Sequence, residues 1–467
     1  MIASKRQMKF AVFMSGDSNY HMAGWRHPES YADGGLNFKR WAEFARTMER
    51  GKLDMLFIAD TIGTPGADDR EQLSFTSKID RFEPLTVLSA LSQVTKKLGL
   101  VATAATTYTA PYTVARMFAS LDFLTEGRAG WNLVTGGNRE DAFNFNLDSH
   151  VPHDERYARA EEFADVVRGL WDSFEDDAFL RDKASGRYFR PDKLHILNHQ
   201  GKYFSVKGPL SVARPPQGHP LIVQAGGSEP SKELTARVAD VMFMSQSDLT
   251  EAKAFYQDVK GRLEKFGRRP EDLKLMPGAF LVIGRSEAEA NERFEELEEM
   301  VPIEVAMARL SHNLGGVDLS GYPLDGPMPE IKGNSARMSA PDSYMKIARR
   351  EHLTLCQTAR RAATAKHHWI VKGTAKQIAD QMEDWFVNEG ADGFNLLPSY
   401  LPGVLNDFVD LVVPELQKRG LFRTEYEGRT LRENLGVPRP QHPASQAAVA
   451  RRNALARIIH KNSSFLA

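Results

Sequence analysis

The chain has 467 residues, of which 42% are apolar and 26% charged, a composition typical of a globular protein with a large core. Its formal net charge of −1 gives no electrostatic case for binding nucleic acid or an anionic membrane, because both favour a basic excess. Cys356 is the only cysteine, which excludes an intrachain disulfide and a thiolate metal cluster.

Short apolar runs alternate with amphipathic helical patterns along most of the chain. In chain order, strands are predicted at Lys9–Met14, Met55–Asp60, Leu98–Thr106, Ala129–Thr135, Leu221–Ala225, Val241–Met244, Leu275–Ile283 and Gly393–Leu397. Helical patterns follow most of them, at 39–50, 85–98, 112–124, 157–171, 231–239, 251–266, 287–300 and 407–419. This alternation favours parallel strands with crossover helices, and eight such units close a (β/α)₈ barrel. A doubly wound open sheet is the competing arrangement.

Three stretches of the chain are additional to the eight strand–helix units of a minimal barrel. Residues 179–219 are predicted to be a loop insertion with the pattern of a hairpin, and residues 302–343, rich in Gly and Pro, to be an unstructured excursion or lid. A C-terminal extension runs over 423–467 and includes the helix-like, basic run ARRNALARIIHK. We therefore expect one barrel domain over 1–422, with insertions near 179–219 and 302–343, followed by this extension.

Polar residues stand where several of the predicted strands end. In a (β/α)₈ barrel this is the functional face. The residues are Asp60, Thr106 and Thr107, Asn132 and Thr135, Gly226 to Ser228, and Asn395. Each has a structural alternative: Asp60 as a helix cap, the threonines as strand formers, and Asn132 as a bridge within the barrel.

Two segments together predict an anion-binding cofactor site. The run VQAGGSEPSKEL, from Val223 to Leu234, is a strand followed by a glycine turn, a serine and a helix start. Such a turn directs backbone N–H groups, a hydroxyl and the helix dipole at a phosphate. The run HDERY begins another helix, and its His153 and Tyr157 share one helical face. The segment HMAGWRHP, from His21 to Pro28, is interpreted as one wall of the pocket or as a packed loop.

The sequence lacks the patterns of metal sites, of nucleotide-binding and esterase motifs, and of targeting segments. The pairs His195 with His199 and His367 with His368 lack a convincing third ligand, so no metal site is expected. The sequence has no strand-linked GxGxxG, no GxxxxGK[ST] and no GxSxG. The N-terminus has no signal-peptide pattern and no run approaches the roughly 20 apolar residues of a membrane span. A cytoplasmic protein is therefore expected.

Several long runs carry a family resemblance. They are LGLVATAATTYTAPYTVARMFASLDFLTEGRAGWNLVTGGN, HDERYARAEEF, VQAGGSEPSKELTARVADVMF, KGTAKQIADQMEDWFVNEGADGFNLLP and FVDLVVPELQKRGLFRTEYEGRTLRENLG. From MKFAVFM to LRENLG the chain resembles the nitrilotriacetate monooxygenase branch of the bacterial luciferase-like flavin monooxygenases, which includes dibenzothiophene sulfone monooxygenases. The resemblance implies a (β/α)₈ barrel that binds reduced FMN supplied by a separate NAD(P)H-dependent flavin reductase. It also implies a homodimer or homotetramer.

The same resemblance implies roles for individual residues. FMN contacts fall on Asp60, Thr106, His153, Tyr157 and Ser228, with Gly227 as a close-approach neighbour and Asn132 facing the isoalloxazine. The implied reaction adds O₂ to reduced FMN to give a flavin 4a-hydroperoxide that oxygenates a small organic substrate. As a hypothesis, His153 bonds near the flavin or its phosphate, while His21 and His312 line the substrate side and assist proton transfer.

Departures from the family pattern concern the substrate. Ala105 stands where many members have serine. Arg26, Arg139 and His21 are hypothesised to meet a carboxylated substrate, with surface or capping duty as the alternative. Two other functions stay open: a deazaflavin-dependent oxidoreductase of the same superfamily, and a flavin-binding barrel without catalysis.

Overall fold

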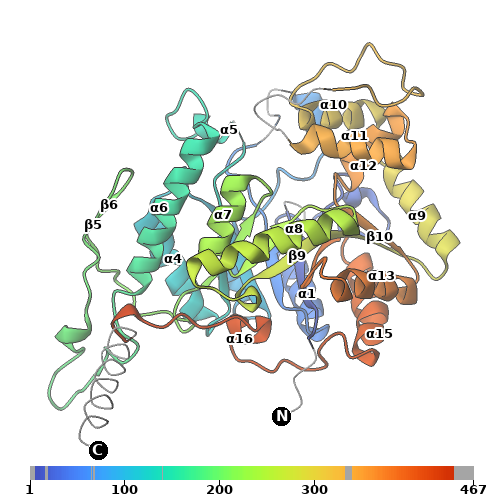
Figure 1. Ribbon diagram of the computed structural model, residues 1–467. Helices are drawn as coiled ribbons and strands as arrows, with labels where there is room; N and C mark the ends of the chain where they lie inside the picture. Colours follow the sequence, from blue (N-terminus) through green and yellow to red (C-terminus); the bar gives the residue numbers. More distant parts are fainter. Residues whose placement is uncertain are drawn as a thin grey trace, which may run out of the picture.

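A closed barrel of eight parallel strands forms the centre of the molecule. The structure is a computed structural model that describes residues 6–445 except 16–18, 65, 67–68, 139 and 332–338 (Figure 1). The strands in barrel order are β1 (Lys9–Met14), β2 (Met55–Ile58), β3 (Gly99–Ala105), β4 (Ala129–Val134), β7 (Leu221–Ala225), β8 (Val241–Met244), β9 (Lys274–Ile283) and β11 (Gly393–Pro398). Pairing of β11 with β1 closes the barrel, so the predicted architecture is confirmed and the open sheet is excluded.

A ninth parallel strand, β10 (Trp369–Gly373), was not predicted. The ten-residue strand β9 is long enough to pair along one edge with two strands in succession. Its first half pairs with β8, and Trp369 is opposite Ala279 in its second half. The run WIVKG is short and follows His367 and His368 directly, so the sequence pattern offered little to mark it. As a result, these two histidines lie just beyond the end of β8.

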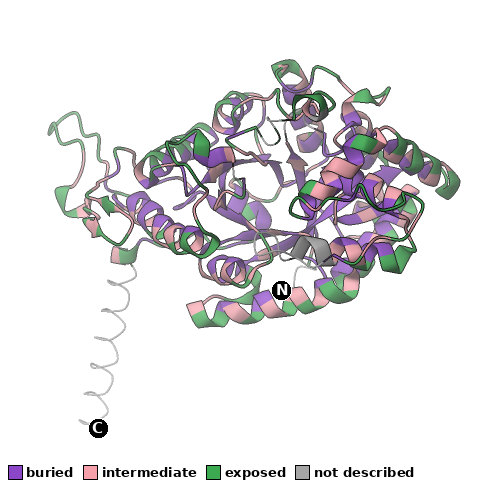
Figure 2. Ribbon diagram, turned by 90° about the horizontal axis from the view of Figure 1, so that it is seen from above, coloured by how far each residue is buried: buried purple, intermediate pink, exposed green. Residues whose placement is uncertain are grey.

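Helices surround the barrel and bury the sides that face it (Figure 2). They include α1 (Phe38–Arg50), α3 (Pro84–Leu91), α4 (Pro111–Leu124), α6 (His153–Trp171), α7 (Glu229–Val238), α8 (Leu249–Arg262), α9 (Glu287–Glu299), α13 (Ala375–Val387) and α15 (Val413–Lys418). Their starts follow local chemistry: Asn37 caps α1, and a capping box of Thr374 with Gln377 opens α13. None of the helices within the described ranges combines the length and hydropathy needed to cross a bilayer.

The C-terminal segment closes the amino-terminal end of the barrel. Alternate strand residues such as Val101, Val223 and Met276 form an interior cluster that also contains Leu431 and Leu435. These two leucines belong to α16 (Leu431–Leu435), which lies across the lower end of the strands (Figure 1). The first part of the extension after residue 422 therefore packs as part of the barrel core. The open end of the barrel is the one where the strands terminate.

Both expected insertions are present, but the second differs from the prediction. The first contains the antiparallel hairpin β5 (His199–Gln200) and β6 (Ser205–Val206), as predicted. In the second, residues 303–313 form a helix, α10 (Ile303–Asn313), so the expectation of an unstructured excursion was wrong there. With α11 (Ser339–Glu351) and α12 (Leu355–Thr364) it builds a separate apolar cluster.

These three helices, hereafter the helical cap, are grouped beyond the carboxyl end of the barrel (Figure 1). In α10, Val305, Ala306 and Leu310 recur at helical spacing, which lets this segment bury an apolar face. The basic run ARRNALARIIHK lies outside the described residues.

Candidate functional site

The open end of the barrel has an aromatic floor. The rings of Phe13, Phe57 and Phe243, from three different strands, lie 5.5 to 5.9 Å apart, centroid to centroid. Phe57 is buried, while Phe13 and Phe243 are only half-buried and so are reached from above. The floor offers a flat ligand an apolar surface of ring faces and edges.

Two asparagines in the barrel wall each present an unpaired oxygen. Asn132 donates from Nδ2 to Thr103 Oγ1 at 2.7 Å, and Thr103 donates to the Ile58 carbonyl at 2.7 Å. The Asn132 Oδ1 and Asn395 Oδ1 atoms are buried and have no partner among the described residues. A buried acceptor without a partner costs about 1–3 kcal/mol. The arrangement therefore fits a ligand that donates hydrogen bonds to them.

Asp60 follows β2 and is held in an ion pair that the sequence did not reveal. Its Oδ1 lies 3.0 Å from Arg81 Nε, with both side chains about one-fifth exposed. Arg81 also donates to the Thr61 hydroxyl at 3.0 Å. Burial raises the pKa of Asp60, and the nearby Arg81 opposes this rise. Asp60 is therefore the partner of Arg81 and caps none of the helices in the described ranges, and its predicted contact with FMN stays a prediction.

The glycine turn after β7 has the geometry expected of an anion cradle, and its binding of an anion stays a prediction. Gly226 has φ of +137°, and a Cβ there would lie 2.6 Å from Ser231 Oγ and 3.5 Å from Tyr157 Oη. The Tyr157 hydroxyl of α6 is thus brought beside the turn that opens α7. Ser228 is the N-cap residue of α7, yet within the described chain its hydroxyl makes no capping bond.

The negative charge in the first turn of α7 is compensated. The Glu229 carboxylate lies 2.9 Å from Lys232 Nζ and 2.7 Å from an Arg262 Nη. Because this acidic group is already paired, it opposes an incoming anion less than a free carboxylate would. The open serine hydroxyl and the helix dipole at this end still favour a phosphate.

His153 and Tyr157 lie together, as their spacing predicted. Their ring centroids are 4.9 Å apart at the start of α6. The His153 side chain is 47% exposed, and its Nδ1 lies 3.0 Å from Asp154 Oδ1. Helix α6 is held to the barrel by Arg159, which donates to the Thr106 carbonyl at 3.4 Å. The arrangement places His153 at the rim of the cradle, and its chemical role stays a prediction.

Two other predicted site residues are deeply buried. Thr106 is fully buried and its hydroxyl donates to the Val134 carbonyl at 3.4 Å. His21 is also fully buried, with Nε2 3.1 Å from Thr364 Oγ1 and Nδ1 accepting from the Ala23 amide at 3.1 Å. Burial lowers the pKa of His21 to about 3. With both ring nitrogens engaged, His21 connects the first loop to the helical cap, and this geometry gives no support to a role in proton transfer.

The remaining substrate-side candidates do not converge. His312 is exposed in the last turn of α10. Arg26 donates to the Met300 carbonyl, which ties the first loop to the segment between α9 and α10. Arg139 lies outside the described residues. The structure instead brings together Tyr20, His367 and His368. The sequence did not predict this grouping, because Tyr20 is far from the two histidines along the chain.

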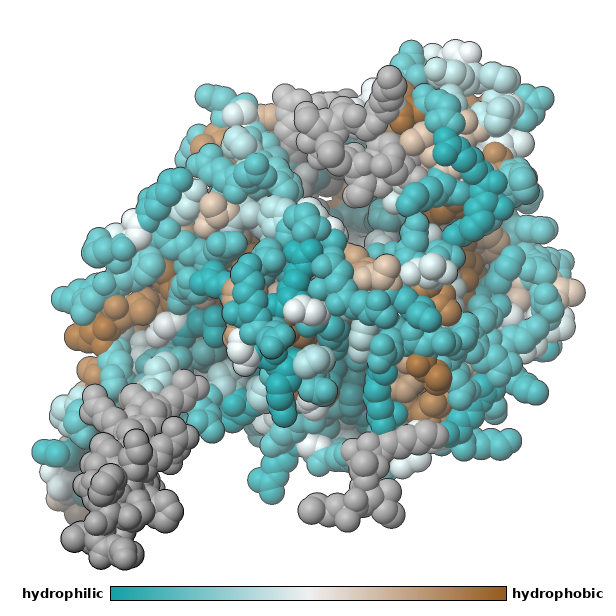
Figure 3. All heavy atoms as spheres, in the orientation of Figure 1, coloured by the Kyte–Doolittle hydropathy of each residue, from teal (hydrophilic) through white to brown (hydrophobic). Residues whose placement is uncertain are grey.

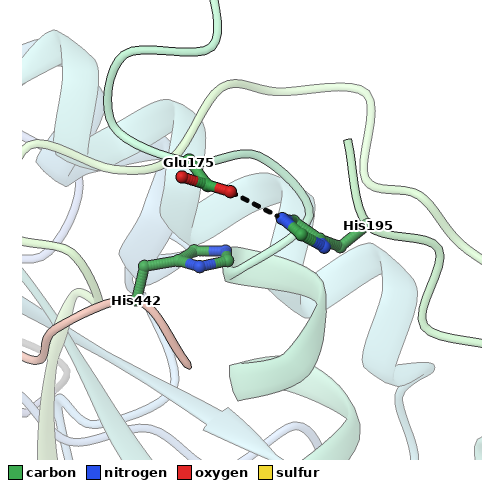
Figure 4. A group of neighbouring side chains, drawn as sticks. All are labelled: Glu175, His195 and His442. Carbon is green, nitrogen blue, oxygen red and sulfur yellow. Dashed lines mark hydrogen bonds and ion pairs between the residues drawn. The ribbon is translucent and has the colours of Figure 1, made fainter. Parts of the chain in front are cut away.

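Glu175, His195 and His442 form a separate cluster of side chains (Figure 4). Their potential ligand atoms lie within 4.8 Å of one another, so His195 is grouped with Glu175 and His442, whereas His199 contacts Glu162. Both His442 nitrogens are engaged by backbone, at 2.9 Å from the Asp172 carbonyl and 3.1 Å from the Ala444 amide. Lys193 Nζ lies 3.7 Å from the other Glu175 oxygen. These contacts favour a hydrogen-bonded tie over a metal site.

Most of the chain matches a known protein family. Residues 8–393 match the family model described as luciferase-like monooxygenase. The chain belongs to the luciferase-like monooxygenase family. It is therefore an enzyme, a monooxygenase, as the resemblance of its sequence indicated.

Named relatives of this monooxygenase match over nearly its whole length. It is 49% identical to nitrilotriacetate monooxygenase component A of Aminobacter aminovorans, over 95% of this chain and 100% of the relative. It is 46% identical to N-acetyl-S-(2-succino)cysteine monooxygenase of Bacillus subtilis, over 94% and 99%. It is 40% identical to dibenzothiophene-sulfone monooxygenase of Rhodococcus erythropolis, over 94% and 99%. A riboflavin lyase crystallised with modified FMN and riboflavin is 32% identical, with a TM-score of 0.82 over 94% of this chain and 99% of the lyase.

Proposed function

We propose that this monooxygenase uses reduced FMN and O₂ to oxygenate a small organic substrate. The observation that carries the proposal is the cradle of Gly226 to Ser228, with the Tyr157 hydroxyl beside the glycine turn. A flavin phosphate fits the open serine hydroxyl and the start of α7. The riboflavin lyase, a relative of the same fold, holds modified FMN in its crystal structure.

The protein's own residues would bind and orient the cofactor. Ser228, Tyr157 and His153 would hold the phosphate end. Asn132 and Asn395 would accept hydrogen bonds from the polar edge of the ring system, which would satisfy their unpaired oxygens. When bound, reduced FMN supplies the electrons that activate oxygen. The aromatic floor and the helical cap would exclude water that would otherwise uncouple oxygen consumption from substrate oxygenation.

The electrons would come from a second protein. The relative in Aminobacter aminovorans is named component A, which indicates a further component in that system. By analogy, we propose a separate NAD(P)H-dependent flavin reductase as the partner of this chain. Reaction in the cytoplasm would give it access to NAD(P)H.

A coupled oxygen assay tests the proposal. The full chain with FMN, NADH and a flavin reductase is expected to consume oxygen and form oxygenated product from a screened set of sulfur, amine and carboxylate compounds. Isotopic labelling with ¹⁸O₂ should place one labelled atom in the product. Oxygen-independent turnover with a reduced deazaflavin would instead support the rival oxidoreductase. FMN binding without any product across the screen would favour a non-catalytic barrel.

We also propose that the chain forms a homodimer or homotetramer through the outer face of α4. The surface view shows mostly hydrophilic residues with small hydrophobic patches between them (Figure 3). On α4, Met117 is 37% exposed, and Phe123 and Leu124 at its end are 44% and 52% exposed. Sedimentation is expected to give a multiple of the 52.3 kDa chain mass, and Met117→Glu should shift it towards the monomer. An unchanged mass for this variant would contradict the proposed interface.

A further inference from the structure

The seam between the barrel and the helical cap holds buried polar groups that the proposed flavin site does not use. Tyr20 follows β1 and is only 2% exposed, and its ring lies 5.6 Å from that of His368, centroid to centroid. His367 and His368 stack at 5.4 Å, and His367 meets the ring of Tyr344 from α11 edge-on at 5.8 Å. The seam thus combines Tyr20 from the loop after β1, the two histidines just before β10, and Tyr344 from the helical cap.

Three hydrogen-bonding atoms at this seam lack partners in the part of the chain that the structure describes. They are Tyr20 Oη, His367 Nδ1 and His368 Nδ1. His368 stacks on Phe243 of the aromatic floor, at 5.4 Å and 18°. A Cβ at Gly278 would lie 2.5 Å from its Nδ1, so the glycine makes room for the ring. The His368 Nδ1 atom lies against this glycine, which leaves Tyr20 Oη and His367 Nδ1 as the unpaired atoms for a ligand to satisfy.

The charged groups around the seam are mainly cationic. Lys366 Nζ lies 4.8 Å and Lys78 Nζ 5.3 Å from the centroid of the Tyr20 ring. Lys366 and His368 also line a cavity of about 260 Å³ whose wall includes Arg350, Arg361, Lys372 and a single carboxylate, Glu351. Arg361 is also paired with Glu298, so four cations lie among two carboxylates, and this excess of positive charge beside the seam favours an anion. Tyr20 and His367 lie next to this cavity's Lys366 and His368 and are not part of its wall.

The unpaired groups can donate without adding charge. Burial raises the pKa of Tyr20 well above its usual value, so its hydroxyl keeps its proton. Burial lowers the pKa of His367 to about 4, so its ring is neutral at physiological pH and can carry one N–H. A phenol O–H and an imidazole N–H, with a lysine ammonium nearby, are suitable partners for a carboxylate.

We propose that Tyr20, His367 and Lys366 form a subsite that binds a carboxylate group of the substrate. The inference rests on the proposed function, because the subsite borders the floor of the same flavin pocket. It assigns this chain to substrates that carry a carboxylate over neutral sulfones or alkanes. Two of the relatives, at 49% and 46% identity, are named for the carboxylated compounds nitrilotriacetate and a succinylated cysteine.

Calorimetric titration of the full chain, with and without FMN, tests the subsite. The probes are nitrilotriacetate and its trimethyl ester, which has the same skeleton without charge. The native chain is expected to bind the tricarboxylate at least about tenfold more tightly than the ester. Tyr20→Phe and His367→Gln should each weaken tricarboxylate binding roughly ten- to hundredfold and leave the affinity for the ester and for FMN unchanged.

The controls separate binding from folding. Tyr112→Phe removes a hydroxyl on α4 that donates to the Pro209 carbonyl at 3.3 Å, and it should not alter binding of either probe. Tyr20→Phe should not lower the melting temperature, since its hydroxyl has no partner among the described residues. Equal affinity of the native chain for the two probes, or native tricarboxylate affinity in both variants, would overturn the subsite. If FMN fails to bind, the proposed function falls, and titration of the flavin-free chain still decides the subsite.

Discussion

Gly226→Ala is expected to weaken FMN binding about a hundredfold, because it would cost the phosphate about two charge-assisted hydrogen bonds. Gly226 has φ of +137°, a conformation that L side chains rarely adopt. The added Cβ would lie 2.6 Å from Ser231 Oγ, so the turn or the first turn of α7 must shift. Either movement displaces Ser228 and the nearby N–H groups. Quenching of flavin fluorescence during titration measures the affinity.

Gly186→Ala is the matched control for that variant. Gly186 also has positive φ, at +72°, but it lies in the first insertion and a Cβ there would meet nothing within 4 Å. This substitution introduces a similar backbone strain at a position outside the cradle. The affinity for FMN should therefore be unchanged. Native FMN affinity in Gly226→Ala would show that the phosphate binds elsewhere.

Arg432→Met is expected to lower the free energy of unfolding by about 3–5 kcal/mol, because it leaves a buried carboxylate unpaired. Two Arg432 nitrogens each donate to Asp240 at 2.8 Å, and a third donates to the His219 carbonyl at 2.9 Å. The Arg432 side chain is 3% exposed and that of Asp240 10%. Denaturant titration followed by circular dichroism measures the loss.

Two further variants test whether the unpaired charge causes this loss of unfolding free energy. Arg429→Met removes an exposed arginine from the same segment, and its effect should stay within about 0.5 kcal/mol. The double variant Arg432→Met with Asp240→Leu should recover part of the stability, because no unpaired charge then remains. A loss for Arg432→Met as small as that for Arg429→Met would contradict the view that α16 closes the barrel as part of its core.

Much of the fold was readable from local patterns. Buried parallel strands appear as short apolar runs, so all eight barrel strands were found by composition and length. The glycine turn at Gly226 was also local, because a strand, a turn and a helix start follow one another within a few residues. The pairing of His153 with Tyr157 depended only on helical spacing. The strand β10 and the helix α10 escaped notice, since one is very short and the other lies beside a segment rich in Gly and Pro.

Local patterns in the chain were thus enough to predict the barrel and the glycine turn, because each depends on periodicity or on neighbours along the chain, and the binding of an anion at that turn stays a prediction. Contacts between side chains that are distant in the sequence came from the tertiary structure alone. It paired Asp60 with Arg81, buried His21 beneath the helical cap, and placed Tyr20 beside His367 and His368, more than three hundred residues away in the sequence. Such contacts are set by barrel closure and by packing of the cap onto the strand ends, and no short-range pattern records them.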